Sequence, residues 1–452
     1  MTAQTRSTML ANETVGKLLF KLSLPAIVAM LVTALYNVVD TIFIGHAVGT
    51  IGIAGLSVAF PIQMLVMGTA QTFGIGGASR ISRCLGAGDA NGAGFTFGNM
   101  VVLAVLTGIG FLIIGLVIPV PILYLFGATD TNLTSALEYF QIINLSSPLM
   151  AFLTTTNGAV RAEGNAHFAM LTMMLGALLN IVLDPIFIFL LDMGIRGAAI
   201  ATVMANVLGC VLLLYYFSAG KSEIPVGWRY FRLVKRIDYE IVTVGFSSFA
   251  RTSSLSLTMI LLNNTLRILG GDISIAAFGI MFRLLMFLFM PLNGITQGLQ
   301  PIVGFNYGAK QYRRVLKSIK IANISATMVA SGAFIVFLAF PEFLMRCFTK
   351  DPVLIASGKN ALRSSLFCLP LAGYQIIGGG VFQALGKAIP ALLVTLSRQV
   401  LILIPMVIIL PKFFGLNGVW YAFPVSDATS FLITLILVKN TIRQLTRTRK
   451  TV

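Results

Sequence analysis

Residues 148–164, PLMAFLTTTNGAVRAEG, align without a gap on residues 370–386, PLAGYQIIGGGVFQALG, when the first half of the chain is shifted by 222 positions. The shift superposes identical residues at the first-half positions Pro148, Gly158, Ala162 and Gly164. It also places Pro119 on Pro341, and the agreement extends from about Ile51 to Ala166. The pattern indicates an ancestral duplication, so two similar structural halves are expected.

The composition indicates whether this chain folds in water or in a lipid membrane. Of its 452 residues, 57% are hydrophobic and only 10% are charged, so a soluble globule of this sequence would have an almost entirely apolar surface. The formal net charge is +17, but the basic residues lie between apolar segments instead of clustering on a polar face. We therefore expect a lipid-embedded protein with no nucleic-acid partner.

A membrane-spanning helix needs about 20 predominantly apolar residues. By this measure the sequence predicts twelve spans, at 18–47, 53–79, 94–118, 134–158, 166–190, 195–217, 239–267, 273–303, 316–340, 356–381, 388–410 and 416–438. The predicted fold is an all-α integral membrane protein with two six-helix bundles. Because six is even, both halves insert with the same orientation, as a parallel repeat with a pseudo-two-fold axis along the membrane normal.

The distribution of lysine and arginine predicts the orientation. Placing both termini in the cytoplasm puts 22 of the 32 basic residues on cytoplasmic segments, as the positive-inside rule requires. We expect a multi-pass protein of the cell's inner, or plasma, membrane. The predicted organisation is a cytoplasmic N-terminus (1–17), an N-lobe (18–217), a basic cytoplasmic linker (218–238), a C-lobe (239–438) and a basic cytoplasmic tail (439–452).

Polar side chains in the first half lie where lipid makes them costly. An ionisable group at bilayer depth costs a few kcal/mol or more, so by default it marks a function. At 1.5 Å per residue, Asp40, Asp184 and Thr202 share a level roughly 10 Å below the outer surface. Asn180 precedes Asp184 by four residues and so lies on the same helix face. A single site is expected to hold all four side chains.

The chemistry of these groups favours a small cation. Two carboxylates, an amide oxygen and a hydroxyl are oxygen ligands suited to a proton or to Na+, and we expect no other cofactor. Pro185 lacks an amide hydrogen, so the carbonyl of Ile181 loses its helical partner and becomes a fifth candidate ligand. The alternative is that Pro185 only bends the helix. Exchange of either ion would supply the energy for antiport.

The second half carries different charges. Its predicted spans contain Arg251, Arg283 and Arg398, with Asp427 as the only intramembrane acid. Arg398 and Asp427 lie at similar depth on neighbouring spans, which favours an ion pair. The other interpretation is that the arginines line a cavity and influence the charge of the substrate. Gln375 is a further candidate for this cavity.

The methionines and histidines of the chain do not indicate an enzyme active site. Met173 and other methionines are candidates for an adaptable apolar cavity wall, although packing is the commoner role. The chain has two histidines, His46 and His167, and neither an HExxH nor a GxSxG motif. The sequence therefore gives no support to an enzyme, and ATP hydrolysis is not expected as its energy source.

Three stretches carry a family resemblance: LSLP (22–25) followed by YNVVD (36–40), SRCLGAGD (82–89), and NIVLDP (180–185), to which FRL (282–284) adds. The chain resembles the multidrug and toxic compound extrusion (MATE) transporters of the bacterial and archaeal branch that includes the MepA-like and DinF-like exporters. The resemblance covers essentially the whole sequence.

The resemblance implies two six-helix lobes, alternating access, and export of cationic amphipathic drugs in exchange for H+ or Na+, and we expect a monomer. The side chains that match its N-lobe ion site are Asp40, Asn157, Asn180, Asp184 and Thr202. Tyr36 and Tyr139 match aromatic positions beside that site. Glu163 departs from the small or apolar residue expected at its position. A flippase for lipid-linked oligosaccharides, from the same superfamily, is the alternative function.

Overall fold

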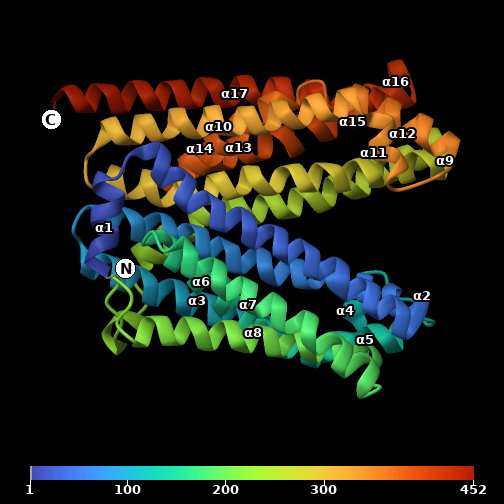
Figure 1. The fold of residues 1–452 in the computed structure, drawn as a ribbon, viewed down its shortest axis with the longest axis horizontal. Helices are drawn as coiled ribbons and strands as arrows, with labels where there is room; N and C mark the ends of the chain where they lie inside the picture. Colours follow the sequence, from blue (N-terminus) through green and yellow to red (C-terminus); the bar gives the residue numbers. More distant parts are fainter. Residues whose placement is uncertain (1–2, 452) are drawn as a thin grey trace. The chain divides into compact units, whose positions relative to one another are not determined.

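The computed structural model describes residues 3–451, and almost all of this range is helical (Figure 1). Positions 1, 2 and 452 of the predicted termini lie outside the described residues. Helices are the expected outcome for long apolar segments, because each helix satisfies its own backbone hydrogen bonds where lipid offers none. The predicted all-α membrane fold is confirmed.

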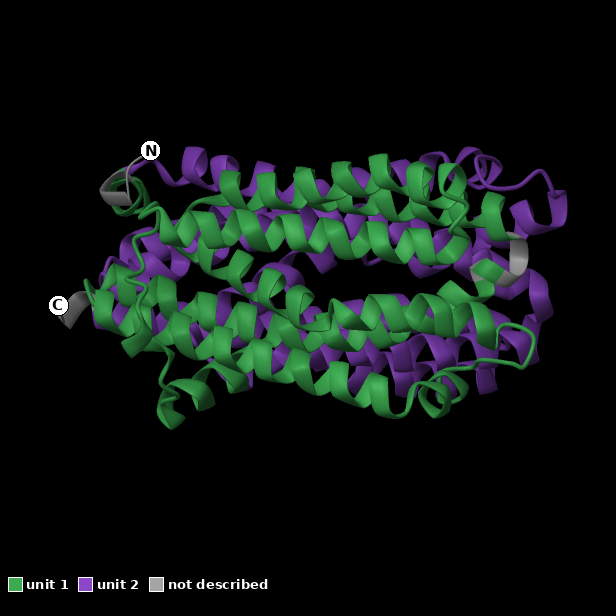
Figure 2. Cartoon of the chain, turned by 90° about the horizontal axis from the view of Figure 1, so that it is seen from below, with its two compact units in different colours: residues 1–12, 28–245 green, residues 13–27, 246–452 purple. Residues whose placement is uncertain are grey.

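The chain forms two compact units (Figure 2). Unit 1 contains Met1–Asn12 and Val28–Gly245, and unit 2 contains Glu13–Ile27 and Phe246–Val452. The helix α2 (Val15–Gly86) therefore begins in unit 2 and continues in unit 1, and α9 (Lys235–Gly308) begins in unit 1 and continues in unit 2. Each unit thus includes the first turns of the long helix that opens the other half of the sequence.

The remaining elements of unit 1 follow α2 in chain order, and several run side by side (Figure 1). Helix α3 packs on α6, and α8 packs on both α7 and α5. The bounds are α1 (Ala3–Asn12), α3 (Ala90–Val117), α4 (Pro119–Leu125), α5 (Leu133–Leu145), α6 (Ser147–Ala162), α7 (Ala166–Pro185), the π-helix η1 (Ile186–Leu190), α8 (Gly194–Ser218) and the 3-10 helix η2 (Trp228–Phe231).

In unit 2, α10 and α17 pack on α13 in the corresponding way. Gly271, with φ 61° and ψ −161°, breaks the long helix α9. The bounds after α9 are α10 (Tyr312–Ala339), α11 (Pro341–Arg346), α12 (Pro352–Ser365), α13 (Leu369–Ala384), α14 (Ala388–Leu396), the π-helix η3 (Ser397–Leu403), α15 (Ile404–Ile409), α16 (Pro411–Phe414) and α17 (Leu416–Thr451).

The helix boundaries reproduce the repeat seen in the sequence. Shifted by 222 positions, α3 coincides with α10 and α6 with α13 at both ends, and the ends of α2 and α9 coincide at Gly86 and Gly308. The left-handed backbone at Gly164, with φ 82°, recurs at Gly386, with φ 72°. The two halves therefore share their helix boundaries and a left-handed glycine as well as their apolar pattern.

All twelve predicted spans fall on these helices. Among the described residues, nine helices are long and apolar enough to cross a membrane, and α12 with α13 adds a tenth as a pair bent by 58°. This count treats α9 as one span, although it contains two predicted spans, which are separated by the break at Gly271. The span predicted at 134–158 is likewise divided, between α5 and α6, beside Pro148.

Glycines allow close backbone contact at equivalent places in the two units. In unit 1, a Cβ built on Gly76 would overlap the backbone of Ile241, whose carbonyl carbon lies 2.7 Å from it. In unit 2, a Cβ on the equivalent Gly298 would lie 2.7 Å from the nitrogen of Ser23. Small residues permit this close approach between membrane helices.

The linker between the halves is docked on unit 1. Asn99 of α3 accepts a hydrogen bond from the amide of Val234 at 2.7 Å and donates to the carbonyl of Arg232 at 3.0 Å. Tyr230 of η2 is buried and packs edge-on against Phe95, with ring centroids 5.1 Å apart. The segment predicted as a linker is therefore an integral part of unit 1.

Candidate ion-binding site

Two carboxylates are buried inside unit 1. Asp40 on α2 is 7% exposed, and Asp184, one residue before the end of α7, is 0% exposed. The two groups are close enough for their charges to interact. A carboxylate withdrawn from water and left without a basic partner requires a proton or a cation, because an unpaired buried charge is strongly disfavoured. No ion pair joins Asp40 or Asp184 to a basic side chain among the described residues.

Asn180 connects Asp184 to the neighbouring helix. Its Nδ2 lies 3.4 Å from Asp184 Oδ1 and 3.4 Å from the hydroxyl of Thr202 on α8. The first contact follows from the four-residue spacing on α7, and the second from the packing of α7 on α8. The Thr202 hydroxyl donates to the carbonyl of Ala198 at 3.1 Å, so its lone pairs face the site. The structure thus brings Asn180, Asp184 and Thr202 together.

Three oxygen atoms of this cluster are buried without a hydrogen-bond donor: Asp40 Oδ1, Asn180 Oδ1 and Asp184 Oδ2. Buried polar atoms are almost always paired, so a concentration of unpaired acceptors indicates a species that is bound there. A proton or a small cation supplies the missing positive partner. No group of three or more His, Cys, Asp or Glu side chains is suited to a metal in the described part of the chain, so Na+ would also need amide and hydroxyl ligands.

The helix that carries Asp184 changes from an α-helical to a π-helical hydrogen-bond pattern directly after this carboxylate. Pro185 ends α7, and residues 186–190 form the π-helix η1, in which the amide of Leu191 bonds the carbonyl of Ile186 at 2.9 Å. Proline removes one helical donor, and short π-helical turns are common at functional sites. The release of the Ile181 carbonyl as a further ligand stays a prediction.

Two tyrosines, Tyr36 and Tyr139, lie within electrostatic range of the acids. Tyr36, one turn before Asp40 on α2, is half-buried and within electrostatic range of both carboxylates. Tyr139 on α5 is 3% exposed and within the same range of Asp40. Its hydroxyl lies 3.4 Å from Nε2 of Gln63 on α2. The sequence analysis missed Gln63, although an amide inside an apolar span was a signal available for it.

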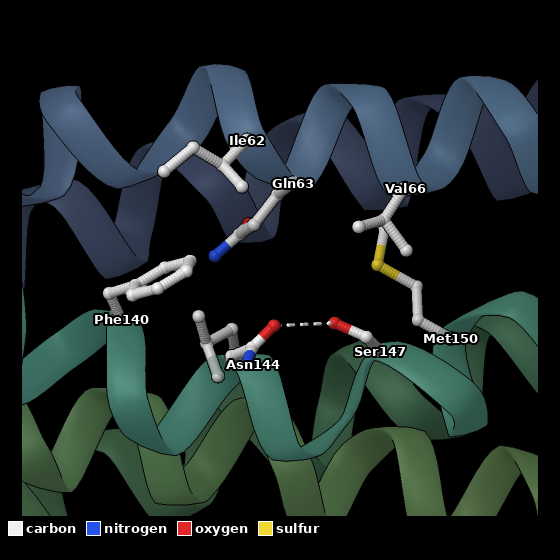
Figure 3. Close-up of a pocket in the computed structure, with 8 residues that line it drawn as sticks. Ile62, Gln63, Val66, Phe140, Asn144, Ser147 and Met150 are labelled. Carbon is white, nitrogen blue, oxygen red and sulfur yellow. Dashed lines mark hydrogen bonds between the residues drawn. The ribbon is translucent and has the colours of Figure 1, made fainter. Parts of the chain in front are cut away.

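Gln63 also faces a small cavity between α2, α5 and α6 that has room for about one water molecule (Figure 3). Its polar wall includes Asn144 and Ser147, whose side chains are hydrogen-bonded to each other at 3.3 Å. The complete lining is Ile62, Gln63, Val66, Phe140, Ile143, Asn144, Ser147 and Met150. Gln63 thus both lines this cavity and contacts Tyr139.

Asn157 occupies a different hydrogen-bonded group. Its Nδ2 donates to the carbonyl of Ala169 at 3.0 Å and to the hydroxyl of Thr172 at 2.9 Å, and its Oδ1 accepts from Arg161. Both ends of the amide are therefore engaged, and none of these bonds reaches Asp184. Direct participation of Asn157 in the ion site stays a prediction. Met173, next to Thr172 on α7, is half-buried.

The intramembrane arginines of unit 2 have different surroundings. Arg398 Nε lies 2.6 Å from Asp427 Oδ1, which confirms the ion pair expected from their depth. Gln375 is buried and donates to the backbone carbonyl of Asp427 at 2.5 Å. Arg283 is exposed, and Arg251 is exposed with a 3.3 Å hydrogen bond to Asn293 Oδ1. Of these three arginines, Arg398 has a carboxylate partner, and Arg251 and Arg283 have none among the described residues.

Glu163, which the sequence left unexplained, lies at the C-terminal cap of α6 with 0% exposure. Its carboxylate accepts from the amide of Glu223 at 2.6 Å and from the hydroxyl of Ser222, and Arg6 of α1 lies 3.6 Å away. Burial raises the pKa of Glu163 to about 7 despite these partners. Glu163 therefore anchors the first helix and the linker on unit 1.

The repeat equivalents of the ion-site residues lack the same chemistry. Asp40 and Asp184 correspond to Leu262 and Met406. The positions of Asn180 and Thr202 are taken by Ile402 and Pro424. The scaffold is duplicated, whereas the buried acid pair belongs to unit 1.

Comparison with known proteins agrees with this division. The family model MatE matches residues 25–186 and again residues 246–409, and the two segments begin 221 positions apart. The multidrug export protein MepA of Staphylococcus saprophyticus is 27% identical over 428 residues, which cover 94% of each chain. MepA of Staphylococcus aureus strain MRSA252 is 26% identical over 94% of this chain and 93% of that protein.

Solved structures of similar fold point the same way. The MATE multidrug transporter DinF-BH, in complex with R6G, is 44% identical with a TM-score of 0.87, covering 95% of this chain and 97% of that one. A Pyrococcus furiosus transporter of the MOP superfamily is 27% identical with a TM-score of 0.90, covering 97% and 98%. The binding pocket of that transporter has reverse polarity, which suggests a different function for it.

Proposed function

The chain belongs to the MatE family of multidrug efflux transporters, and we propose that it is a secondary antiporter driven by a cation bound at Asp40, Asn180, Asp184 and Thr202. The coupling ion is H+ or Na+, and the exported substrates are cationic amphipathic drugs and related toxic compounds. The substrate class is supported by the relatives described as multidrug exporters and by the DinF-BH complex with R6G. The proposed orientation has both termini in the cytoplasm, as the distribution of basic residues favours.

The observation that carries this proposal is the set of three unpaired buried oxygens in unit 1. When the acids bind a proton or Na+, the buried charge is compensated. When the ion leaves, two carboxylates remain close together in a dry site, and that state is costly. A conformational change that wets the site relieves this cost, so ion occupancy favours one arrangement of the transporter over the other. Ion binding and substrate export are coupled in this way.

The test is dye efflux from proteoliposomes under a pH gradient and, separately, under a Na+ gradient. We expect one gradient to drive efflux by the wild type, and Asp40→Asn and Asp184→Asn each to lower the rate at least about tenfold, since a ligand to a charged species contributes roughly 1.5–3 kcal/mol. The matched control is Asp130→Asn, because Asp130 is exposed and accepts a hydrogen bond from the hydroxyl of Tyr124 at 2.7 Å. Normal gradient-driven efflux by both acid variants would rule out the proposed site.

A further inference from the structure

Arg251 is an exposed arginine within a predicted membrane span of unit 2. The first segment of α9, from Lys235 to the break at Gly271, is 36 residues long, roughly 54 Å, and Arg251 lies near its middle. No carboxylate pairs with it among the described residues, in contrast to Arg398, which has Asp427. An intramembrane arginine without a counter-ion is costly, so its position requires a partner.

The helix face of Arg251 is polar, and the hydroxyl side chains on it are buried, whereas Arg251 itself is exposed. Ser247 precedes it by four residues, Ser254 follows by three and Thr258 by seven, and all three hydroxyl side chains are buried. Ile260, which is 61% exposed, follows by nine residues and therefore lies on the opposite face of the helix. The guanidinium thus belongs to the polar face of α9 and not to its exposed apolar face.

Asn293, on the second segment of α9, completes a group of hydrogen-bond donors. Its Oδ1 accepts from Arg251 Nη1 at 3.3 Å, so its Nδ2 points away from the guanidinium. In the part of the chain that the structure describes, that Nδ2 makes no hydrogen bond. The remaining guanidinium N–H groups and the amide N–H group are all donors, an arrangement that suits a carboxylate or a phosphate.

We propose that Arg251 and Asn293 form an anion-binding subsite in unit 2 that holds the carboxylate, sulfonate or phosphate group of an amphiphile. The proposal rests on the proposed function for the identity of that amphiphile as transported cargo. A substrate that is a zwitterion brings its own anionic group to this subsite. An anionic phospholipid headgroup offers the same chemistry from a different source.

The test compares two dyes that share one cationic ring system. Rhodamine B carries a free carboxylate, and its ethyl ester does not. Equilibrium binding of both dyes to the full chain in phosphatidylcholine nanodiscs is measured by fluorescence anisotropy. Arg251→Gln is expected to weaken binding of rhodamine B by about 10-fold or more, the loss of a hydrogen bond to a charged group, and to leave binding of the ester within about twofold. Arg251→Lys, which keeps the charge but not the fork of donors, is expected to be intermediate.

A second measurement identifies the lipid source. Native mass spectrometry counts phosphatidylglycerol molecules retained by the wild type and by Arg251→Gln after purification from membranes containing that lipid. A selective loss of rhodamine B binding supports the subsite with cargo as its ligand, and a selective loss of phosphatidylglycerol supports it with lipid as its ligand. Equal losses for both dyes, or no change in dye or lipid, would overturn the proposal.

The outcome is separable from that of the antiport mechanism. Dye binding is measured without an ion gradient, so it does not require coupling. Asp184→Asn is expected to keep the difference between the two dyes, because its side chain lies in unit 1 and Arg251 lies in unit 2. Normal efflux by the acid variants would end the coupling proposal and leave the anion subsite standing.

Discussion

Asn180 donates a 3.4 Å hydrogen bond to Asp184 across one turn of α7. The same nitrogen reaches the hydroxyl of Thr202, while the oxygen of the amide has no donor. Asn180 therefore uses its donor to position two groups of the site and keeps its acceptor for the bound species. An aspartate at this position would have only acceptors, and a leucine would have neither.

The first prediction concerns this division of roles. Asn180→Leu removes the ligand oxygen and the positioning donor, so the half-saturating concentration of the coupling ion in dye exchange should rise about tenfold or more. Thr202→Val, which removes only the hydroxyl, should give a smaller rise. An unchanged half-saturating concentration in Asn180→Leu would show that the amide does not contact the ion.

The second prediction concerns the buried ion pair of unit 2. Asp427→Asn removes the counter-ion of Arg398, and position 427 is only 3% exposed. The free energy of unfolding should therefore fall by about 3–5 kcal/mol. The double variant Arg398→Leu with Asp427→Leu removes both charges and should recover most of that loss. Thermal unfolding of the wild type, Arg398→Leu, Asp427→Leu and the double variant forms a double-mutant cycle. Additive effects of the two single changes would contradict a direct interaction.

The sequence predicted most of the scaffold because local pattern determines it. Apolar runs separated by basic loops predict the helices, and the repeat aligns Gly164 with Gly386, which share a left-handed backbone in the structure. The acid cluster was also accessible, because Asn180 and Asp184 are four residues apart and any carboxylate at bilayer depth requires a function.

Other contacts depend on residues distant in sequence and were not predictable. Glu163 is explained by Arg6 and Ser222, which lie on either side of it at 157 and 59 positions in the chain. Asn157 matched the ion site by position, but the turn between α6 and α7 directs its amide to Thr172. Gln63 has meaning only once α5 places Tyr139 opposite it.

The third prediction concerns the pH dependence of stability at Glu163. Its folded pKa, about 7, lies above the ordinary value of 4.5, so the folded state binds this proton more tightly than the unfolded state. The stabilising contribution is fully present below pH 4.5 and is lost as the pH rises through about 7. Thermal stability of the wild type relative to Glu163→Gln should therefore decrease between pH 5 and pH 8. Parallel curves for the two proteins over this range would contradict a raised pKa.

The fourth prediction concerns the glycine contacts that recur in both halves. Gly76→Ala places a Cβ against the backbone of Ile241, which cannot rotate away as a side chain would, so we expect a loss of about 1–3 kcal/mol. Gly298→Ala should behave similarly in unit 2 because its Cβ meets the backbone of Ser23. Gly110→Ala is the matched control, since nothing lies within 4 Å of its Cβ position and alanine favours the helix by up to about 1 kcal/mol.

Thermal unfolding of the three variants in one detergent separates packing from helix propensity. Because every variant makes the same chemical change in a membrane helix, propensity alone predicts that all three gain stability. Close backbone packing predicts that Gly76→Ala and Gly298→Ala lose stability while Gly110→Ala does not. Equal shifts in all three variants would show that the backbones at these two helix crossings separate enough to accept a methyl group. Close packing at Gly76 and Gly298 would then contribute nothing to stability.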